Sequence, residues 1–328
     1  MRVAFDSKMT LLAIVIVVLI LPWCVGSFHL YTLSLILVNI IVATGLNLLT
    51  GNAGQVSLCN STFMAIGAYS TMILNLKLGF MYWLALPAGG LIAAVLGFGL
   101  GVPALRLRGY YLALATLGFL EIMQIVVQES SSLTGGVRGL LAPKPSLAGF
   151  KLTDQTFYYF ILAISFFMIY VARNLLRSPF GRAFNAIRNS EVAAQSLGIS
   201  LSQVKVFAFT ISAFYAGLAG GLYAPLVGFV DPVEFGLWTS IFHLTMIIVG
   251  GLGSLTGSIV GAVVITGLPE WLRGLKEYRD LAFGGVLLCF LIFMPTGIAG
   301  MRAHFRRPLD HLPKGIEVNG NSDELLHS

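Results

Sequence analysis

The chain has 328 residues, of which 20 are basic and 14 acidic, so only 10% carry a charge. Soluble globular domains carry about 25%, and here the apolar fraction is 57% with a mean hydropathy of +0.87. Between Thr10 and Leu105 the only charged side chain is Lys77. So few ionised groups cannot cover the surface of a soluble fold. The composition therefore excludes soluble, disordered and disulfide-stabilised proteins and indicates an all-α polytopic membrane protein.

The first apolar segment follows Arg2 and Lys8 and resembles a secretory signal. It lacks a small-residue cleavage site and is followed by many further apolar segments, which favours a first transmembrane helix. We expect residues 1–8 to form a short cytoplasmic N-terminus. The three cysteines lie in apolar segments without metal-ligand spacing, so we interpret them as small buried side chains.

About 20 apolar residues are needed for a helix to cross the hydrocarbon core. The sequence predicts about ten such spans: 9–26, 30–50, 56–76, 80–105, 109–127, 157–171, 204–230, 237–249, 257–272 and 281–294. The spans 237–249 and 257–272 meet at a glycine-rich stretch, either as two full helices joined by a tight turn or as two half-helices that enter and return. We expect a membrane domain over 9–300 and a polar, disordered cytoplasmic tail over 301–328.

Basic residues cluster in particular connections and predict the orientation, since cytoplasmic loops carry an excess of Lys and Arg. They lie between the fourth and fifth spans (Arg106, Arg108), in the loop 172–203 (Arg173, Arg177, Arg182, Arg188) and after the last span (Arg302, Arg306, Arg307). The connection with Asp231 and Glu234 and the loop 128–156 are then external. With ten spans both termini are cytoplasmic, and Lys77 is the one exception. Basic residues placed between apolar spans do not form the face that binds nucleic acid.

Two segments combine small residues with a tyrosine inside a predicted span. They are Ala65-Ile-Gly-Ala-Tyr69 and Ala219-Gly-Gly-Leu-Tyr-Ala224. Transporters are often built from internal repeats, but small residues also recur wherever membrane helices pack closely. Both interpretations stay open from the sequence.

The loop 172–203 contains a predicted amphipathic helix from Arg182 to Leu197. Pro179 ends the preceding helix, apolar residues recur at Phe184, Ile187, Val192 and Ala194, and Gly198 is a typical C-terminal cap. Such a helix either docks into a groove on a cytoplasmic partner or lies on the membrane surface.

Four groups of residues, in order, resemble the LivM-type permeases of branched-chain amino acid ABC importers. Glu191-Val-Ala-Ala194 followed by Gly198 is similar to the EAA loop that docks on the ATPase subunit. The other groups are Gly54-Gln-Val-Ser-Leu with Ala65-Ile-Gly-Ala-Tyr69; Arg106-Leu-Arg-Gly-Tyr-Tyr-Leu-Ala-Leu-Ala-Thr-Leu117 with Leu133-Thr-Gly-Gly136; and Gly250-Gly-Leu-Gly-Ser254 with Gly261-Ala262. The similarity covers about residues 30–297. It implies an ATPase-coupling loop carried by Arg182, Arg188, Glu191, Ala193, Ala194 and Gly198.

The resemblance implies a permease subunit in the bacterial inner membrane. Its partners would be a second homologous permease, two cytoplasmic ATPases that use ATP and magnesium, and a periplasmic solute-binding protein. The chain departs from the pattern at Cys59-Asn60, where relatives usually have Gly-His, and at Phe242-His243, where many carry a glutamate. The resemblance implies leucine, isoleucine and valine as cargo, with other amino acids, urea or short amides, and aromatic acids as alternatives.

Polar residues inside predicted spans are the candidates for a translocation path. Glu121 lies mid-span with Gln124 three residues later, and an intramembrane acid faces a partner or a wet cavity. Glu121 either lines the path or holds helices together, and His243 is either a packing or a path residue. Gln55 and Asn60, from the segment of the second motif, complete the candidate path.

No catalytic grouping or phosphate-binding loop of the Walker type is present in the sequence. The chain is therefore expected to bind no cofactor or metal and to leave ATP hydrolysis to partner subunits. An autonomous secondary transporter is the competing class, although such proteins usually bury several charges at the midplane. A membrane enzyme would need a clustered acid, base or metal set.

Overall fold

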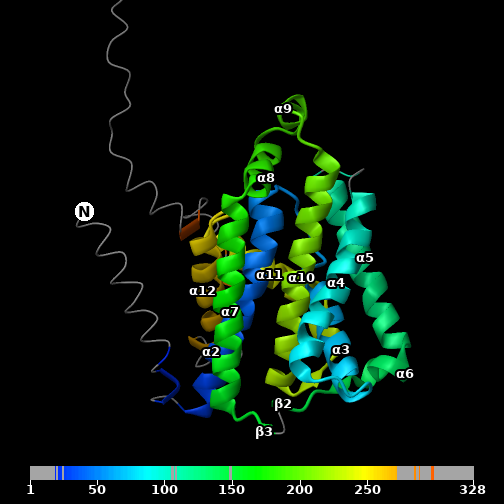
Figure 1. Cartoon of the computed structure of the whole chain (residues 1–328), viewed down its shortest axis with the longest axis vertical. Coiled ribbons are helices and arrows are strands. Elements are labelled where there is room, and N and C mark those ends of the chain that lie inside the picture. Colours follow the sequence, from blue (N-terminus) through cyan, green and yellow to red (C-terminus); the bar gives the residue numbers. More distant parts are fainter. Residues whose placement is uncertain are drawn as a thin grey trace, which may run out of the picture.

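A computed structural model of the whole chain (Figure 1) describes residues 26–104, 107, 109–147 and 150–271, with short pieces at 19, 21–23, 284–285, 288 and 297–298. The expected tail 301–328 and N-terminus 1–8 lie outside the described residues, as do most of the expected spans 9–26 and 281–294. The count of about ten spans and the side on which the termini lie stay predictions.

The described part of the chain is almost entirely helical, which confirms the all-α class. Its long elements are α2 (Ser27–Leu46) with the π-helical turn η1 (Asn47–Asn52), α3 (Asn60–Leu76), α4 (Tyr82–Ala104), α5 (Tyr110–Glu129), α7 (Asp154–Arg177), α10 (Leu201–Val227), α11 (Leu237–Gly250) and α12 (Leu255–Trp271). The short helices are α6 (Ser131–Thr134), η2 (Gly136–Arg138), α8 (Pro179–Asn189), α9 (Glu191–Ser196) and η3 (Pro232–Phe235). Five of the described helices are long and apolar enough to cross a membrane.

Two small antiparallel ladders accompany the helices. Strand β1 (Leu140–Leu141) pairs with β4 (Phe229–Val230), and β2 (Ser146–Leu147) pairs with β3 (Phe150–Lys151). The strands lie in the connections that follow η2 and α10, at the end of the bundle opposite α8 and α9 (Figure 1). We call these the strand end and the hairpin end.

The structure corrects two of the predicted spans. Helix α7 is longer than the predicted 157–171 because it begins at Asp154, capped by the Thr153 side chain, and runs on to Arg177. Helix α3 begins only at Asn60, because residues 53–59 after η1 leave the helical conformation. The chain therefore has non-helical backbone next to buried residues, which a membrane protein tolerates only where protein or a wet cavity covers it.

The charged residues of the loops are only partly separated between the two ends, because Arg138 of η2 and Lys144, between β1 and β2, lie at the strand end. Arg173 and Arg177 lie at the hairpin end of α7, whereas Asp231 and Glu234 lie beside β4 at the strand end (Figure 1). Lys77, predicted to be the one exception, also lies at this end and donates hydrogen bonds to the backbone oxygens of Ser132 and Leu133, 2.9 Å away in the second case. Its position at the strand end is thus explained by a local contact that ties α3 to the loop after α5.

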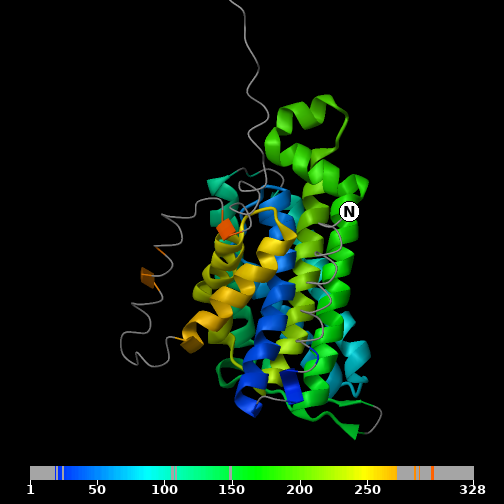
Figure 2. The ribbon, with the colours of Figure 1, turned by 90° about the vertical axis from the view of Figure 1, so that its left-hand side faces the viewer.

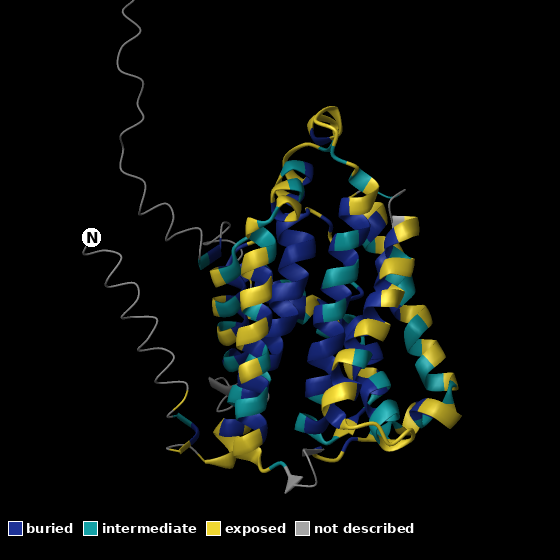
Figure 3. Cartoon of the chain, in the orientation of Figure 1, coloured by how far each residue is buried: buried dark blue, intermediate teal, exposed yellow. Residues whose placement is uncertain are grey.

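Helix α10 forms the centre of the bundle and packs against α4, α3 and α2. In the most apolar window of α10, and in that of α2, 72% of the residues are buried, against 17% in α5 and 28% in α7. Figure 3 shows the same contrast between the dark interior helices and the largely exposed α5 and α7. The outer helices α5 and α7 therefore present apolar surface that a bilayer or another protein must cover.

Small residues let the central helices approach closely. A methyl group added at Gly67 would overlap the backbone of Gly217, and one added at Gly220 would overlap the backbone oxygen of Met64. The two similar segments singled out in the sequence thus face each other in the α3–α10 contact. Close helix packing accounts for their small residues without a repeat.

Helices α11 and α12 form an antiparallel pair joined by the turn 251–254 (Figure 2, yellow to gold). Gly250 and Gly257 lie so close that a methyl group at either would overlap the other's backbone. A tight turn thus joins the two helices at the glycine-rich stretch, and both are shorter than the described helices that are long enough to cross a membrane. Helix α11 has 14 residues and is about 21 Å long. Strand β4 and helix η3 precede it and connect it to the end of α10.

The α3–α10 contact predicts a large effect for a single added methyl group. Gly220→Ala should lower the free energy of unfolding by about 1–3 kcal/mol because the methyl overlaps the α3 backbone. Gly99→Ala, in α4 where a methyl meets nothing within 4 Å, is the control and should be neutral or slightly stabilising. Thermal unfolding of the detergent-solubilised protein measures both, and equal midpoints would contradict this packing.

Candidate functional site

The loop expected to couple to a partner projects from the hairpin end (Figure 2). Pro179 occupies the first turn of α8, where its missing N–H and fixed φ suit a helix start. Phe184 and Ile187 of α8, with Ala194 of α9, are buried in one apolar cluster with Leu49 and Ala208. The apolar face predicted for the loop is thus turned toward the protein and fixes the loop to α10 and η1.

The single predicted helix from Arg182 to Leu197 is wrong. The structure divides it at Ser190, which is extended at φ −162° and ψ 114° and caps α9 by accepting a hydrogen bond from the N–H of Ala193. Serine competes well for such a cap position, which the apolar spacing alone did not reveal. Gly198 adopts φ +79° just after α9, which confirms its predicted capping position.

The break turns the tip of the loop outward. Val192, which the spacing placed on the buried face, is 73% exposed, and Leu197 is 79% exposed. Ala193 and Arg182 are also exposed, whereas Ala194 is buried. Two large, exposed apolar side chains at the end of a projecting hairpin are typical of a surface that binds another protein or a membrane.

Glu191 forms an ion pair within the chain. Lys205 Nζ, on α10, lies 2.6 Å from Glu191 Oε1, and the Lys205 side chain is only 8% exposed. Glu191 also lies in the first turn of α9, where a carboxylate is favoured by the helix dipole. Glu191 therefore fixes the orientation of α9 against α10, a contact that the sequence did not predict.

Asn47 ties the end of α2 to the turn between α11 and α12. Its Oδ1 accepts a hydrogen bond from the N–H of Gly253 at 2.8 Å, and its Nδ2 donates to the backbone oxygen of Ser254 at 3.0 Å. Asn52 Nδ2 donates to the backbone oxygen of Gly253 at 3.3 Å. These amides satisfy backbone groups of an irregular turn, which would otherwise be costly to bury. We call Asn47, Asn52, Gly253 and Ser254 the amide junction.

Arg188 of α8 reaches the amide junction. A methyl group added at Gly54 would lie 3.4 Å from Cα and Cγ of Arg188, and one added at Gly253 would overlap its guanidinium nitrogen Nη1. Both glycines have positive φ, +71° and +83°, a conformation that glycine adopts without strain. The coupling loop therefore touches both broken segments of the membrane domain through one side chain.

Buried polar side chains join the first turns of α3 and α11. The hydroxyls of Ser61 and Ser240 are 2.7 Å apart, and the Ser61 hydroxyl donates to the backbone oxygen of Gly236. Asn60 Nδ2 lies 3.5 Å from Nδ1 of His243, which is 2% exposed. The two positions at which the sequence departs from the LivM pattern are thus neighbours in space, and His243 has a polar partner in the packed interior.

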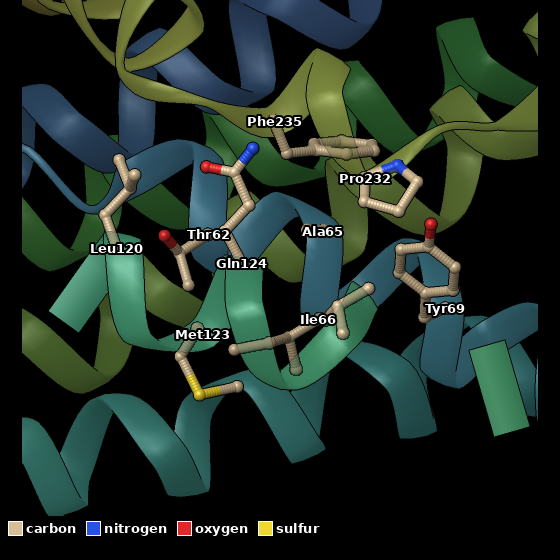
Figure 4. Close-up of a pocket in the computed structure, with 10 residues that line it drawn as sticks. Thr62, Ala65, Ile66, Tyr69, Leu120, Met123, Gln124, Pro232 and Phe235 are labelled. Carbon is tan, nitrogen blue, oxygen red and sulfur yellow. The ribbon is translucent and has the colours of Figure 1, made fainter. Parts of the chain in front are cut away.

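The remaining path candidates lie apart from one another. Gln124 lines a narrow cavity between α5, α3 and η3, where its side chain lies between Thr62 and Phe235 (Figure 4). The cavity measures ≈ 10 Å³, about enough for one water molecule. Glu121 is exposed on the outer face of α5, and Gln55 is buried next to Gly54. The candidates thus differ in their surroundings, since Gln124 lines a small cavity, Glu121 is exposed and Gln55 is buried.

The strand end carries an acidic cluster. Tyr223 donates a hydrogen bond to Glu234 Oε2 at 3.2 Å, and Asp231 caps η3 through the N–H of Val233. Burial raises the pKa of the Glu234 carboxyl, Tyr223 lowers it and the charge of Asp231 raises it. Glu234 thus takes up a proton more readily than an exposed glutamate. Within the described ranges, no three His, Cys, Asp or Glu side chains group closely enough to hold a metal ion.

Comparison with known proteins assigns the family. The profile of the branched-chain amino acid transport system permease component matches residues 28–293. The chain belongs to this family. It is 37% identical to the high-affinity branched-chain amino acid transport system permease protein LivM of Salmonella typhimurium, over 90% of this chain and 75% of that protein. The LivM protein of Escherichia coli is 36% identical over the same shares, and LivH of Salmonella typhimurium is 26% identical over 79% of this chain and 90% of that protein. No solved structure matches the chain.

Several residues of this permease that bear on the site were not predicted. They are polar residues in or next to apolar helices: Asn47, Ser61, Ser240 and Lys205. The first three contact residues that are far away in the sequence. Lys205 contacts Glu191, 14 positions before it. Buried polar groups in a membrane find partners, so each was a candidate for a contact. The partner itself depends on tertiary packing, which a single sequence does not reveal.

The Glu191–Lys205 pair predicts a charge-swap rescue. Glu191→Lys removes a hydrogen bond between charged groups, worth about 1.5–3 kcal/mol, and places two cations together. Local opening of α9 should rise at least tenfold, seen as faster proteinase K cleavage in residues 178–200. Adding Lys205→Glu should restore most of the protection. Cleavage rates that do not differ among the three proteins would contradict the pair.

Proposed function

We propose that this chain is the membrane-spanning permease subunit of a bacterial ABC importer that carries branched-chain amino acids. The family match over residues 28–293 carries the proposal, and the names of the LivM and LivH relatives give the cargo class. The chain itself binds no cofactor and is no enzyme, because partner ATPases bind and hydrolyse ATP with magnesium. Urea, short amides or aromatic acids are the alternative cargo, since Asn60 and His243 depart from the LivM pattern.

The hairpin end faces the cytoplasm in this proposal. The basic residues of α7 and α8 gather there and the acidic cluster lies at the opposite end, as the excess of basic residues in cytoplasmic loops requires. About ten spans within residues 9–300 place both termini, including the tail 301–328, in the cytoplasm. The protein is then a multi-pass protein of the inner membrane, and its strand end meets a periplasmic solute-binding protein.

The tip of the hairpin docks on a cytoplasmic ATPase. Val192 and Leu197 are the exposed apolar side chains, and such side chains, surrounded by a polar rim, are typical anchors of an interface. The Glu191–Lys205 pair and the Ser190 cap hold α9 in place beneath them. Glu191 thus supports the docking surface, and Arg182, Ala193 and Gly198 lie within or beside it.

The outer face of α5 meets the second, homologous permease. Placing an ionised Glu121 against lipid would cost about 2.5–3.5 kcal/mol on insertion scales, and Glu121 is exposed on the surface of this chain. A second permease over α5 would cover the carboxylate and leave a polar path between the two subunits. The ammonium group of an amino acid then passes Glu121, and Gln124, Asn60, His243 and Gln55 are the further path candidates within this chain.

An autonomous secondary transporter is the competing proposal. Its support is limited to Glu121, which is exposed on α5, and His243, which is buried. Such transporters usually place several ionisable groups together at the midplane. The permease proposal also explains the exposed hairpin tip.

Affinity purification of the tagged chain from its native membrane, followed by mass spectrometry, tests the proposed function. The wild-type protein should bring along a second permease and ATP-binding subunits. Val192→Asp should lose at least 90% of the ATPase while keeping the second permease, because a buried carboxylate at the interface costs several kcal/mol. Val137→Asp, at a 73% exposed valine of the strand end, is the matched control. Recovery of the wild-type chain alone would contradict the proposal.

Glu121→Gln tests the path. The variant should accumulate and assemble like the wild type, because Glu121 is exposed on this chain, but its uptake of leucine should fall at least fivefold. Glu129→Gln, exposed at the strand end of the same helix, is the control and should transport normally. Loss of stable protein in the Glu121→Gln variant would instead assign Glu121 to holding the helices together.

A further inference from the structure

We propose that Arg188 is a positioning residue that carries movement of the α8–α9 hairpin into the membrane domain. In this structure Arg188 packs against Gly54 and Gly253, a position that we call its seat. Arg188 would act by moving from this seat to the side-chain oxygens of Asn52 and Gln55. The inference rests on the proposed function and names the route by which docking is coupled to transport.

The seat of Arg188 is built from backbone. Its Cα, Cβ and Cγ lie over Gly54, and its guanidinium lies against Gly253, leaving no room for a side chain at that glycine. Glycines 54 and 253 belong to segments about 200 positions apart in the sequence, and Arg188 lies close to both. A shift of α8 therefore moves both segments through one contact.

Gly253 connects the seat to the interior of the bundle. It is bound to Asn47 and Asn52 and follows α11 closely, so movement at the turn is passed along that helix. Helix α11 in turn holds Ser240 and His243 against the first turn of α3. A displacement that begins at Arg188 thus reaches the contact between the buried polar side chains of α3 and α11.

Two buried side-chain oxygens near the seat accept no hydrogen bond from the residues that the structure describes. Asn52 is 4% and Gln55 5% exposed, and Asn52 Oδ1 and Gln55 Oε1 have no hydrogen-bond partner among the described residues. Leaving buried acceptors unpaired is costly, and a guanidinium offers five donors in a fixed fork. Asn52 and Gln55 lie on either side of Ala53 and Gly54 in the sequence, so both are neighbours of the seat. A second arrangement, in which Arg188 donates to both amides, would therefore be favourable.

The two arrangements give the membrane domain a pair of states. In the present one Arg188 packs on glycine backbone; in the other it binds the amides and releases the turn at Gly253. An ATPase that binds the hairpin better in one state shifts the equilibrium toward it, since only differential binding moves such an equilibrium. Transport is then coupled to ATP hydrolysis through this exchange.

The whole transporter, reconstituted in proteoliposomes with the second permease, the ATPases and the solute-binding protein, tests the inference. Labelled leucine uptake and ATP hydrolysis are measured together. Arg188→Gln should keep the ATPases bound and hydrolysing, while leucine taken up per ATP falls at least tenfold. Arg173→Gln, an exposed arginine at the hairpin end of α7, is the control and should keep the wild-type ratio.

A second variant changes an acceptor that Arg188 is proposed to bind. Gln55→Met removes the acceptor at similar length and should also lower the uptake per ATP, and the double variant with Arg188→Gln should show no further fall. An unchanged ratio in Arg188→Gln, loss of the ATPases from it, or multiplicative effects in the double variant would each overturn the inference. Absence of ATP-dependent uptake by the wild-type complex would instead overturn the proposed function itself.

Discussion

The structure depends on one constraint: backbone that leaves the helical conformation inside the membrane domain must still find hydrogen bonds. In the part of the chain that the structure describes, residues 53–59 and the turn 251–254 leave the helical conformation near the hairpin end. At the turn 251–254, the Asn47 side chain supplies these hydrogen bonds: it accepts from the backbone N–H of Gly253 and donates to the backbone oxygen of Ser254. Because the same amide holds α2 to both α11 and α12, the broken segments lie together. Their glycines are then within reach of Arg188, so a requirement of folding also creates a contact between the cytoplasmic hairpin and the interior.

Close packing divides the bundle into a fixed centre and an open periphery. Glycines on α3 and α10 bring those helices into backbone contact, which leaves little freedom for relative movement. Helix α5 has only three buried residues and carries an exposed glutamate. In a permease this division has a functional meaning, because the rigid centre transmits movement while the periphery meets a second subunit or lipid. The exposed carboxylate favours the subunit over lipid at α5.

Much of the architecture could be predicted from the sequence. Hydropathy located α4, α5, α10, α11 and α12 within a few residues. The helix break at Ser190 was missed because apolar spacing runs across it, whereas the cap that causes the break depends on one serine hydroxyl. The outward position of Val192 follows from that break. The pairing of Asn60 with His243 could not be predicted, since two residues 183 positions apart carry no sign of their contact in a single sequence.

A permease subunit of this kind moves solute only as part of an ATP-driven assembly. Uptake of labelled leucine into proteoliposomes, with ATP inside or absent and with each subunit omitted in turn, distinguishes such a subunit from an autonomous transporter. Uptake is expected only when this chain, the second permease, the ATPases, the solute-binding protein and ATP are all present. Uptake by this chain alone without ATP would establish an autonomous transporter instead.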